Sequence, residues 1–361
     1  MNAMGPDAAT AAHDGKEPSA AVPGVDHAGL SRWLTTLVGD TTLPLRVQRI
    51  GVGQSNLTYV LADAGGRRWV LRRPPVGHLL SSAHDVLREA RILAALASTD
   101  VPVPQVFGVA QTGEVSDGPL VLMEFVDGIV ISDAAASNTL PAHARHHAGI
   151  ALAETLGRIH AVNLQAANLA DLASHSPYGH RQLKRWSGQW EQSKTRQLPD
   201  LDALTDRLRA AIPPPRELSL VHGDLHLRNI VVSVTGEILA ALDWELSTLG
   251  DPIADLGTTL AYWPEHEEAV LPEFRALLLP GYPRRADLIE RYCTTTGRDV
   301  THAELGFWHA LALWKIAIIA EGILRRTQQD LRNRASSGMP TAQTVNDLVV
   351  LGHQIAARAG I

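Results

Sequence analysis

The first third of the chain alternates between two hydrophobic periodicities. Apolar residues recur every second position in several short runs, as in half-buried strands, and they recur at helical spacing in Leu30–Val38 and Ala83–Ala97. The predicted strands are two within Leu45–Leu61, on either side of the sequence GVGQSN, and one each at Arg68–Arg72, Gln105–Ala110 and Leu120–Phe125. This pattern predicts a small antiparallel sheet with one main helix.

The pattern changes after Val126-Asp127-Gly128, which we interpret as a hinge between two lobes. The segments beyond it are mainly long and helical, and they surround one compact β insert. Predicted helices are His143–Val162, Gln182–Gln192, Ala286–Thr295 and His302–Arg326, and the insert is Asn229–Val234 and Glu237–Leu242 around the turn Thr235-Gly236. The expected fold is therefore α+β and bilobal, with a larger, mainly helical second lobe.

Three segments follow from these patterns. Residues 1–26 are rich in Ala, Gly, Pro and Asp without periodicity, which is typical of a disordered leader. Residues 27–126 form the predicted N-terminal, nucleotide-binding lobe, and residues 127–361 form the C-terminal lobe with catalysis and substrate binding.

Composition narrows the possible partners and the compartment. The net charge of −6 and the lack of a long basic run disfavour binding to nucleic acid. A single cysteine, Cys293, and the lack of an apolar signal segment near the start lead us to expect a cytoplasmic protein. The most apolar segment, Leu311–Leu324, contains Lys315 and Glu321, so we expect a buried helix and no membrane span.

Candidate chemistry concentrates around the β insert. The sequence HGDLHLRN, residues 222–229, follows an apolar run, and Asp243 ends the second strand of the insert. Phosphoryl transfer needs a carboxylate beside the attacking hydroxyl, and a carboxylate with an amide oxygen to hold Mg²⁺. A tight hairpin would bring Asn229 close to Asp243. The alternative is that His222, Asp224 and Asp243 only cap turns, which explains neither the glycine-containing stretch upstream nor Glu89.

The motif HGDLHLRN followed by LDW resembles the aminoglycoside phosphotransferase family over residues 30 to about 330, which implies a protein-kinase-like fold. More narrowly, FVDG, RQLKRWSGQWEQS, LDWELSTLGDPIADL and WKIAIIAEGI resemble the kinase domains associated with acyl-CoA dehydrogenases and their free-standing bacterial relatives. The resemblance implies ATP and Mg²⁺ as cofactors and an alcohol group as phosphate acceptor.

The same resemblance assigns residue roles. Asp224 would accept the proton of the substrate hydroxyl, Asn229 and Asp243 would bind magnesium, and His222 would be a structural brace. The loop over the phosphates would be Gly51, Gly53, Gln54, Ser55 and Asn56, since glycines let backbone amides approach the oxygens. We also assign Glu124 and Val126, beside the expected hinge, to nucleotide binding.

The chain departs from the kinase pattern at the phosphate-binding lysine, because no lysine lies between Ala20 and Arg181. Strand alternation places Arg72 where that lysine would be, with Glu89 as its partner. Arginine keeps the charge but grips phosphate with a planar fork. Arg73, on the opposite strand face, is the fallback, and Glu89 could instead be a solvated helix charge.

Three further residues of the second lobe have two interpretations. His226 lies two residues after Asp224, so it could contact phosphate or substrate as a catalytic residue, or be an ordinary loop histidine. Asp251 and Asp255 could be metal ligands, although capping the next helix and bracing the catalytic loop is the favoured interpretation.

The segment Tyr178–Leu198 bears on the nature of the phosphate acceptor. It carries five basic residues, one acidic residue and two tryptophans. Such a surface favours an anionic or partly apolar acceptor, such as a hydroxyacyl-CoA or hydroxy acid, over a polycationic aminoglycoside. The candidate substrate residues are Arg185, Trp186, Trp190 and Glu245. Helix packing is the alternative role for the tryptophans.

Two other functions remain open at this point. One is an antibiotic kinase, acting on an aminoglycoside or macrolide with the same machinery. The other is a nucleotide-binding pseudokinase scaffold, which the missing lysine suggests and the intact Asp224, Asn229 and Asp243 oppose. A protein kinase is disfavoured, because nothing after Asp243 resembles an activation segment. The sequence leaves open the acceptor, the choice between ATP and GTP, and the oligomeric state.

Overall fold

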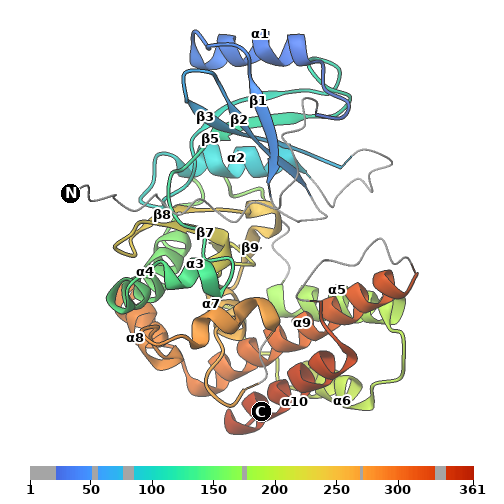
Figure 1. The fold of residues 1–361 in the computed structure, drawn as a ribbon. Helices are drawn as coiled ribbons and strands as arrows, with labels where there is room; N and C mark the ends of the chain where they lie inside the picture. The colour runs from blue at the N-terminus through green and yellow to red at the C-terminus, as the bar shows by residue number, and fades with distance from the viewer. Residues whose placement is uncertain (1–21, 51–55, 76–84, 173–176, 269–270, 330–338) are drawn as a thin grey trace, which may run out of the picture. The chain divides into compact units, whose positions relative to one another are not determined.

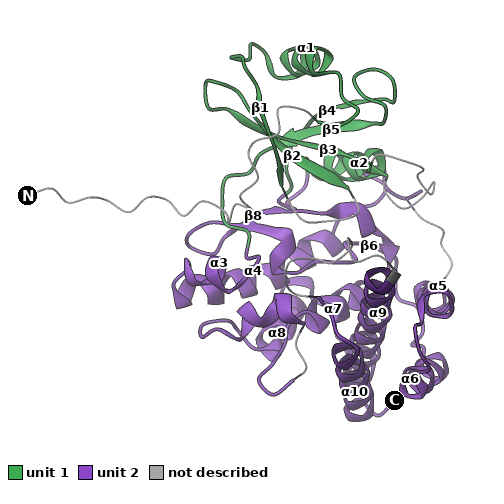
Figure 2. Cartoon of the chain, turned by 45° about the vertical axis from the view of Figure 1, so that its right-hand side comes forward, with its two compact units in different colours: residues 1–98, 103–130 green, residues 99–102, 131–361 purple. Residues whose placement is uncertain are grey.

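The computed structural model describes residues 22–50, 56–75, 85–172, 177–268, 271–329 and 339–361 (Figure 1). The chain divides into two compact units (Figure 2): residues 1–98 with 103–130, and residues 99–102 with 131–361. The first unit therefore ends four residues beyond the predicted division after residue 126. The short segment 99–102 joins the second unit because the carbonyl of Pro102 accepts a hydrogen bond from the Ala241 amide at 2.8 Å.

The first unit is a five-stranded sheet with two helices. Neighbouring strands are antiparallel throughout, in the order β1-β2-β3-β5-β4. Its elements are α1 (His27–Val38), β1 (Arg46–Ile50), β2 (Leu57–Ala62), β3 (Arg68–Arg73), α2 (Val86–Leu96), β4 (Val106–Ala110) and β5 (Leu120–Glu124). The predicted small antiparallel sheet with a helix after its third strand is confirmed, and the second predicted helix, α1, is about as long as α2.

The two faces of β3 have different neighbours. Trp69 and Leu71 point into a hydrophobic core that includes Leu30 and Leu34 of α1. Because side chains alternate along a strand, Arg72 points to the opposite face, where its guanidinium meets Glu89 of α2. The helices α1 and α2 therefore cover opposite faces of the sheet (Figure 1).

Residues 22–26 belong to the first unit and not to the leader. Val22 is 2% exposed within the core, and Val25 forms an antiparallel bridge with Ser116. The carbonyl of Pro23 also accepts a hydrogen bond from Arg73. Residues 22–26 are mostly small and do not alternate between apolar and polar, so the sequence does not predict a strand here. The residue that pairs with Val25 lies about ninety residues further along the chain, where no local pattern can indicate it. The rest of the predicted leader, residues 1–21, lies outside the described residues.

The second unit is mainly helical, as predicted. Its helices are α3 (Ala134–Asn138), α4 (Ala142–His160), α5 (Tyr178–Ser193), α6 (Pro199–Ala210), α7 (Pro252–Ala261), α8 (Arg285–Thr296), α9 (His302–Gln329) and α10 (Ala342–Arg358). Short 3-10 turns are η1 (Leu227–Asn229), η2 (Trp244–Leu246) and η3 (Pro272–Leu278). The helix α9 contacts α5, α6, α7 and α10.

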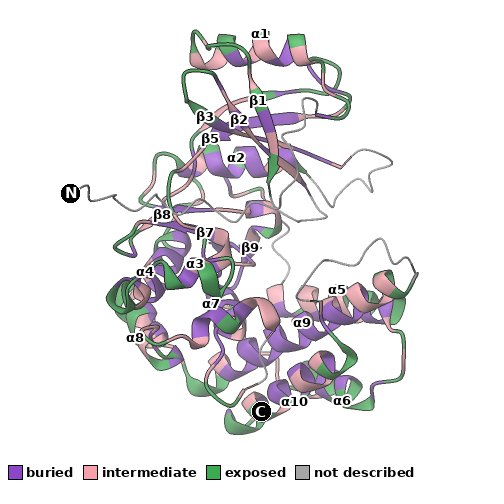
Figure 3. Cartoon of the chain, in the orientation of Figure 1, coloured by how far each residue is buried: buried purple, intermediate pink, exposed green. Residues whose placement is uncertain are grey.

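The helix α9 is the predicted buried helix. It is the one helix among the described residues whose length and composition would also suit a membrane span, and 78% of its most apolar window is buried within the fold. Figure 3 shows the same burial along its length. Phe307, Leu313 and Trp314 are each at most 1% exposed. Its apolar sequence is thus explained by packing inside the second unit.

Four short strands lie beside these helices. They are β6 (Ser219–Val221), β7 (Ile230–Val232), β8 (Ile238–Ala241) and β9 (Thr248–Gly250). The strands β7 and β8 form the predicted hairpin, and β6 pairs with β9. At the hairpin turn Gly236 has φ +86°, a left-handed conformation that favours glycine. A Cβ on Gly236 would lie 2.1 Å from the carbonyl oxygen of Ala144, so the turn packs directly on α4.

Candidate active site

The segment His222–Asn229 forms a loop between β6 and β7 that is held by Asp255 of α7. The Asp255 carboxylate accepts hydrogen bonds from the amides of His222 (2.6 Å) and Gly223 (2.8 Å). Asp251 caps α7 by accepting a hydrogen bond from the Ile253 amide at 2.9 Å. Capping and bracing, the favoured roles for Asp251 and Asp255, are the ones the structure shows.

Two further side chains, His160 and Tyr292, hold the Asp255 carboxylate in place. His160 of α4 contacts the Asp255 carboxylate through Nε2 at 3.2 Å, and the Tyr292 hydroxyl contacts His160 Nδ1 at 2.8 Å. Burial lowers the pKa of His160 despite the opposing charge of Asp255. A neutral imidazole donates to Asp255 and accepts from Tyr292, so both contacts are satisfied without a buried cation. Helices α4, α7 and α8 thus jointly fix the start of the loop.

His222 is the brace that the resemblance implied. Its side chain is fully buried, its Nε2 donates to the Leu242 carbonyl at 3.0 Å, and its Nδ1 accepts from the Asp224 amide at 3.3 Å. Its ring lies 4.6 Å from the Trp244 ring, between centroids. His222 therefore links the loop to Leu242, the residue that directly follows β8.

Asn229 and Asp243 lie at the same end of the β7–β8 hairpin. Asn229 immediately precedes β7. The amide of Leu242, the residue before Asp243, donates a hydrogen bond to the carbonyl oxygen of Asn229 at 2.8 Å. The Asn229 amide nitrogen donates to the backbone oxygen (3.0 Å) and the carboxylate (3.2 Å) of Asp224, which turns its Oδ1 oxygen the other way. An amide oxygen and a carboxylate are hard oxygen donors of the kind Mg²⁺ prefers.

Asp243 has a left-handed backbone with φ +64° and ψ +63°. This conformation is uncommon for a residue other than glycine and is enriched at functional sites. Among the described residues no cluster of three or more His, Cys, Asp or Glu side chains forms a metal site. Asn229 would supply an amide oxygen and Asp243 a carboxylate, and such ligands fit a magnesium ion that also binds phosphate oxygens and water.

Asp224 lies between a histidine and a lysine. Its side chain is 24% exposed, and one carboxylate oxygen is 3.5 Å from His226 Nε2. Burial alone would raise the pKa of Asp224, but the neighbouring His226, Lys315 and His222 outweigh it and hold the pKa below its usual value. The carboxylate is therefore ionised at neutral pH and can accept a hydrogen bond or a proton.

His226 sits in an aromatic cluster below Asp224. Its ring is 4.8 Å from Tyr262 and 5.0 Å from Phe274, between centroids, and the residue is 8% exposed. Burial, with the charge of Asp224 and a hydrogen bond to it, raises the pKa of Tyr262. The sequence did not single out Tyr262. His226 is thus held against the catalytic loop with its Nε2 edge towards Asp224 and Asn229.

In the first unit, Arg72 and Glu89 form the predicted ion pair. Arg72 Nη1 lies 2.7 Å from Glu89 Oε1, and the side chains are 12% and 2% exposed. Glu89 is therefore not a solvated helix charge. The fallback Arg73 is 2% exposed and held 2.5 Å from Asp117, so its guanidinium is already committed to the other face of the sheet.

The remaining predicted nucleotide residues are only partly described. Gly51, Gly53, Gln54 and Ser55 lie outside the described residues, whereas Asn56, directly before β2, is buried. Glu124 ends β5 and accepts a hydrogen bond from the Gln105 amide at 3.1 Å. Val126 follows it and is half-buried.

The four candidate substrate residues separate into different environments. Trp190 is 3% exposed and donates to Asp202 at 3.1 Å, so it packs in the interior and is not a binding surface. Trp186 is half-buried, and its ring lies 5.4 Å from the guanidinium carbon of exposed Arg185. Glu245 lies in η2 directly after Asp243. Helix packing explains Trp190 because it faces α6, whereas Trp186, four residues earlier, is displaced around the helix by about 40°.

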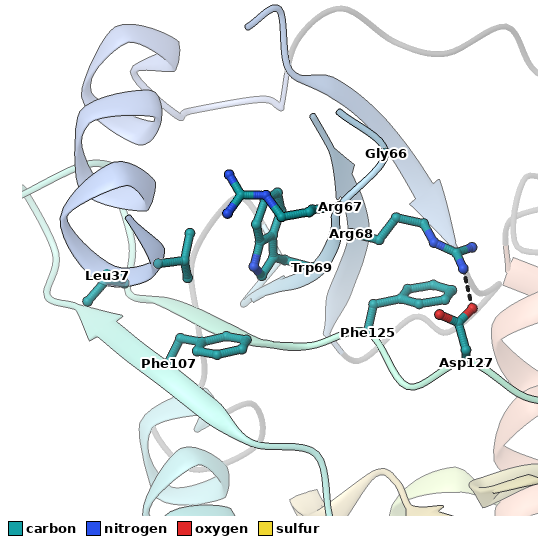
Figure 4. A pocket seen from close by; sticks show the side chains of 9 residues that line it. Leu37, Gly66, Arg67, Arg68, Trp69, Phe107, Phe125 and Asp127 are labelled. Atoms are coloured by element: carbon teal, nitrogen blue, oxygen red, sulfur yellow. Dashed lines mark hydrogen bonds and ion pairs between the residues drawn. The ribbon is translucent and has the colours of Figure 1, made fainter. Parts of the chain in front are cut away.

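A cavity of about 470 Å³ lies in the first unit (Figure 4), and its lining includes Phe125 and Asp127 on either side of Val126. Leu37, Trp69 and Phe107 line it, together with Arg68, which forms an ion pair with Asp127. Leu37 belongs to α1 and Trp69 to the strand face that α1 covers, so the cavity does not include Arg72. We assign no role in phosphate binding to it.

Comparison with known proteins gives one family. A model of the phosphotransferase enzyme family matches residues 46–288. Acyl-CoA dehydrogenase family member 10 of Mus musculus is 35% identical over 319 residues, 87% of this chain and 29% of that protein. Family member 11 of Rattus norvegicus is 31% identical over 333 residues, 91% of this chain and 42% of that protein. The chain thus spans less than half the length of these relatives.

Solved structures agree with the fold. A protein of Ralstonia eutropha JMP134, provisionally named an aminoglycoside phosphotransferase, is 31% identical with a TM-score of 0.72, covering 92% of this chain and 99% of that one. Aminoglycoside phosphotransferase APH(4)-Ia, solved with AMP-PNP and hygromycin B, has a TM-score of 0.59 at 17% identity, covering 92% and 99%. The predicted kinase-like α+β fold and both resemblances, to aminoglycoside phosphotransferases and to acyl-CoA dehydrogenase relatives, are confirmed.

Proposed function

The chain belongs to the phosphotransferase enzyme family, and from this premise we propose that it is a small-molecule kinase that transfers the γ-phosphate of ATP to a hydroxyl group. The observation that carries the proposal is the meeting of Asp224, Asn229 and Asp243 at one end of the β7–β8 hairpin. One ionised carboxylate and two hard oxygen donors are the set that phosphoryl transfer uses.

Each of these residues has a distinct role in the proposed reaction. Asp224 orients the acceptor hydroxyl and takes its proton as the oxygen–phosphorus bond forms and the bond from γ-phosphorus to ADP breaks. Its lowered pKa keeps it ready to accept at neutral pH. Asn229 Oδ1 and the Asp243 carboxylate would hold magnesium, which neutralises charge on the phosphates.

Arg72 is proposed to take the place of the usual phosphate-binding lysine. Glu89 holds its guanidinium through one terminal nitrogen at 2.7 Å. A guanidinium has five N–H donors in a planar fork, a geometry that can bind a carboxylate and phosphate oxygens together. The residues 51–56 are proposed to cover the phosphates with backbone amides, as the glycines in that stretch suggest.

The proposed acceptor is a hydroxyacyl-CoA or a hydroxy acid. Similarity to acyl-CoA dehydrogenase family members 10 and 11 supports an acyl substrate. The basic and aromatic face of α5 at Arg185 and Trp186 supports the same choice, because it suits an anionic or partly apolar molecule better than a polycation.

The test is transfer of the labelled γ-phosphate of ATP, with Mg²⁺, to four separate acceptor pools: hydroxyacyl-CoAs, hydroxy acids, aminoglycosides and macrolides. We expect labelled product in one of the first two pools. Product only with aminoglycosides or macrolides would replace this acceptor class by an antibiotic. No product in any pool, with ATP still bound, would favour a nucleotide-binding scaffold.

A further inference from the structure

Lys315 brings a cation from α9 to the catalytic loop. Its ammonium lies 3.4 Å from the carbonyl oxygen of Gly223, the residue before Asp224. The charge of Lys315 is among those that lower the pKa of Asp224. The chain has four lysines among its 32 lysines and arginines, and this one lies between apolar neighbours in the middle of α9. A half-buried position in this helix therefore carries a charge beside the proposed catalytic carboxylate.

The same ammonium lies next to α5. It is 5.5 Å from the centroid of the Trp186 ring, and the guanidinium carbon of Arg185 is 5.4 Å from that ring. Trp186 is fixed in turn by a hydrogen bond from its indole to Gln182 at 3.1 Å. Two cations and one indole ring thus lie together, and one of the cations, Lys315, contacts the residue before Asp224.

The ammonium has little to bind within the protein. An ammonium offers three hydrogen-bond donors, and among the described residues Lys315 donates to one acceptor, the Gly223 carbonyl, at a long distance. Burial lowers the pKa of Lys315 against the opposing charges of Asp224 and Asp255. A partly buried cation gains most from an oxygen that arrives with a ligand, since such a bond is charge-assisted and shielded from water.

We propose that Lys315 is the residue that selects the acceptor, by donating to an acyl oxygen, either a carboxylate or a thioester carbonyl, of the molecule whose hydroxyl meets Asp224. This inference rests on the kinase function proposed above. The Trp186 ring packs against the apolar carbons between the two groups, and Arg185 adds a second positive charge. Acceptors that carry a hydroxyl but no acyl oxygen do not use Lys315.

The test uses three probes that share a hydroxylated four-carbon chain: 3-hydroxybutyrate, 3-hydroxybutyryl-CoA and 1,3-butanediol. Binding of each is measured by calorimetry with Mg²⁺ and a non-hydrolysable ATP analogue, for the wild type and Lys315→Met. Methionine matches the length of the stem and suits a buried site, so we expect a folded variant, checked by thermal melting. Arg185→Gln is a second variant at an exposed position.

We expect Lys315→Met to weaken the acyl probe that binds the wild type by about ten-fold or more, as for a lost charge-assisted hydrogen bond, and to leave the diol unchanged. The two acyl probes separate a carboxylate from a thioester carbonyl as the group recognised. Lys194→Met is the matched control, because Lys194 pairs with Glu191 at 2.6 Å on the surface.

Three outcomes would overturn the inference: equal weakening of acyl probes and diol, no weakening of any probe, or a wild type that binds no acyl probe better than the diol. Because the readout is binding, its failure is separable from failure of the kinase function. Binding that depends on Lys315 without phosphoryl transfer would contradict the kinase and leave this acyl site standing.

Discussion

At the scale of single residues, the ion pair of Arg72 and Glu89 decides how the first unit would hold phosphate. We predict that Arg72→Ala raises the KM for ATP by about ten-fold or more, because charge-assisted hydrogen bonds are lost. The change also removes the ion pair with Glu89, which is 2% exposed, so stability falls as well. Steady-state kinetics and thermal melting measure both effects.

Two control variants separate the positive charge at position 72 from the position of the arginine on β3. Arg72→Lys keeps the charge and the pair with Glu89, so it should retain most activity. Arg68→Ala removes an arginine of the same strand that pairs with Asp127 at the surface, and it should leave the KM unchanged. Unchanged ATP affinity and turnover in Arg72→Ala would exclude Arg72 from phosphate binding.

The residues of the proposed catalytic set that could be singled out from the sequence share a local motif. Asp224, Asn229 and Asp243 are linked by one loop and one hairpin, and short-range geometry suffices to bring such residues together. Lys315 lies in α9, 92 residues beyond Gly223, and Tyr262 directly follows α7. Helix packing places Lys315 and Tyr262 beside the loop, and no local sequence pattern predicts this proximity.

At the scale of elements, the β7–β8 hairpin positions the proposed metal ligands through its contact with α4. We predict that Gly236→Ala destabilises the protein by about 1–3 kcal/mol more than Gly66→Ala, as expected for overpacking. Both glycines have φ near +87°, at +86° and +88°, so backbone strain is matched. A Cβ on Gly236 would meet the Ala144 carbonyl, whereas one on Gly66 has nothing within 4 Å.

Denaturation of both variants in urea measures the difference. Gly236→Ala should also raise the Mg²⁺ concentration needed for transfer, since a displaced hairpin moves Asn229 and Asp243 together. Equal loss of stability in the two variants would mean that the turn does not depend on its contact with α4.

No bounds were predicted from the sequence for the helices α6, α7 and α10 of the second unit, although α7 was expected as the helix that follows Asp251 and Asp255. The helix α7 is buried on nearly all sides, so its sequence PIADLGTTLA lacks a polar face that would mark a helix. The helix α6, PDLDALTDRLRA, begins with proline and carries many charges. These helices are stabilised by packing against α9, which is a tertiary contact.

At the scale of the whole molecule, buried histidines make stability depend on pH. Burial lowers the pKa of His160 and His222, against the charge of Asp255, and it holds the pKa of His309 well below normal, with Arg285 adding to the effect. The unfolded chain binds these protons near pH 6.5, whereas the folded chain does not. Stability is therefore complete above that pH and falls as the pH drops through it.

We predict that the free energy of unfolding is lower at pH 5.5 than at pH 7.5, with each such histidine contributing at most about 1.4 kcal/mol per pH unit. Urea denaturation at both pH values measures it. His309→Gln should reduce the slope, and His146→Gln, at an exposed position, is the matched control. A slope of zero, or one that His309→Gln leaves intact, would mean that these histidines take up protons in the folded state.

The proposed kinase function depends on phosphate transfer through Asp224. The most direct measurement is phosphate transfer from labelled ATP with Mg²⁺, comparing the wild type with Asp224→Asn at saturating nucleotide, with ATP binding measured separately for both. We predict a labelled product for the wild type, a loss of about a hundred-fold or more in Asp224→Asn, and nearly equal ATP affinity. Equal transfer by both proteins, or ATP binding without transfer by either, would contradict the account.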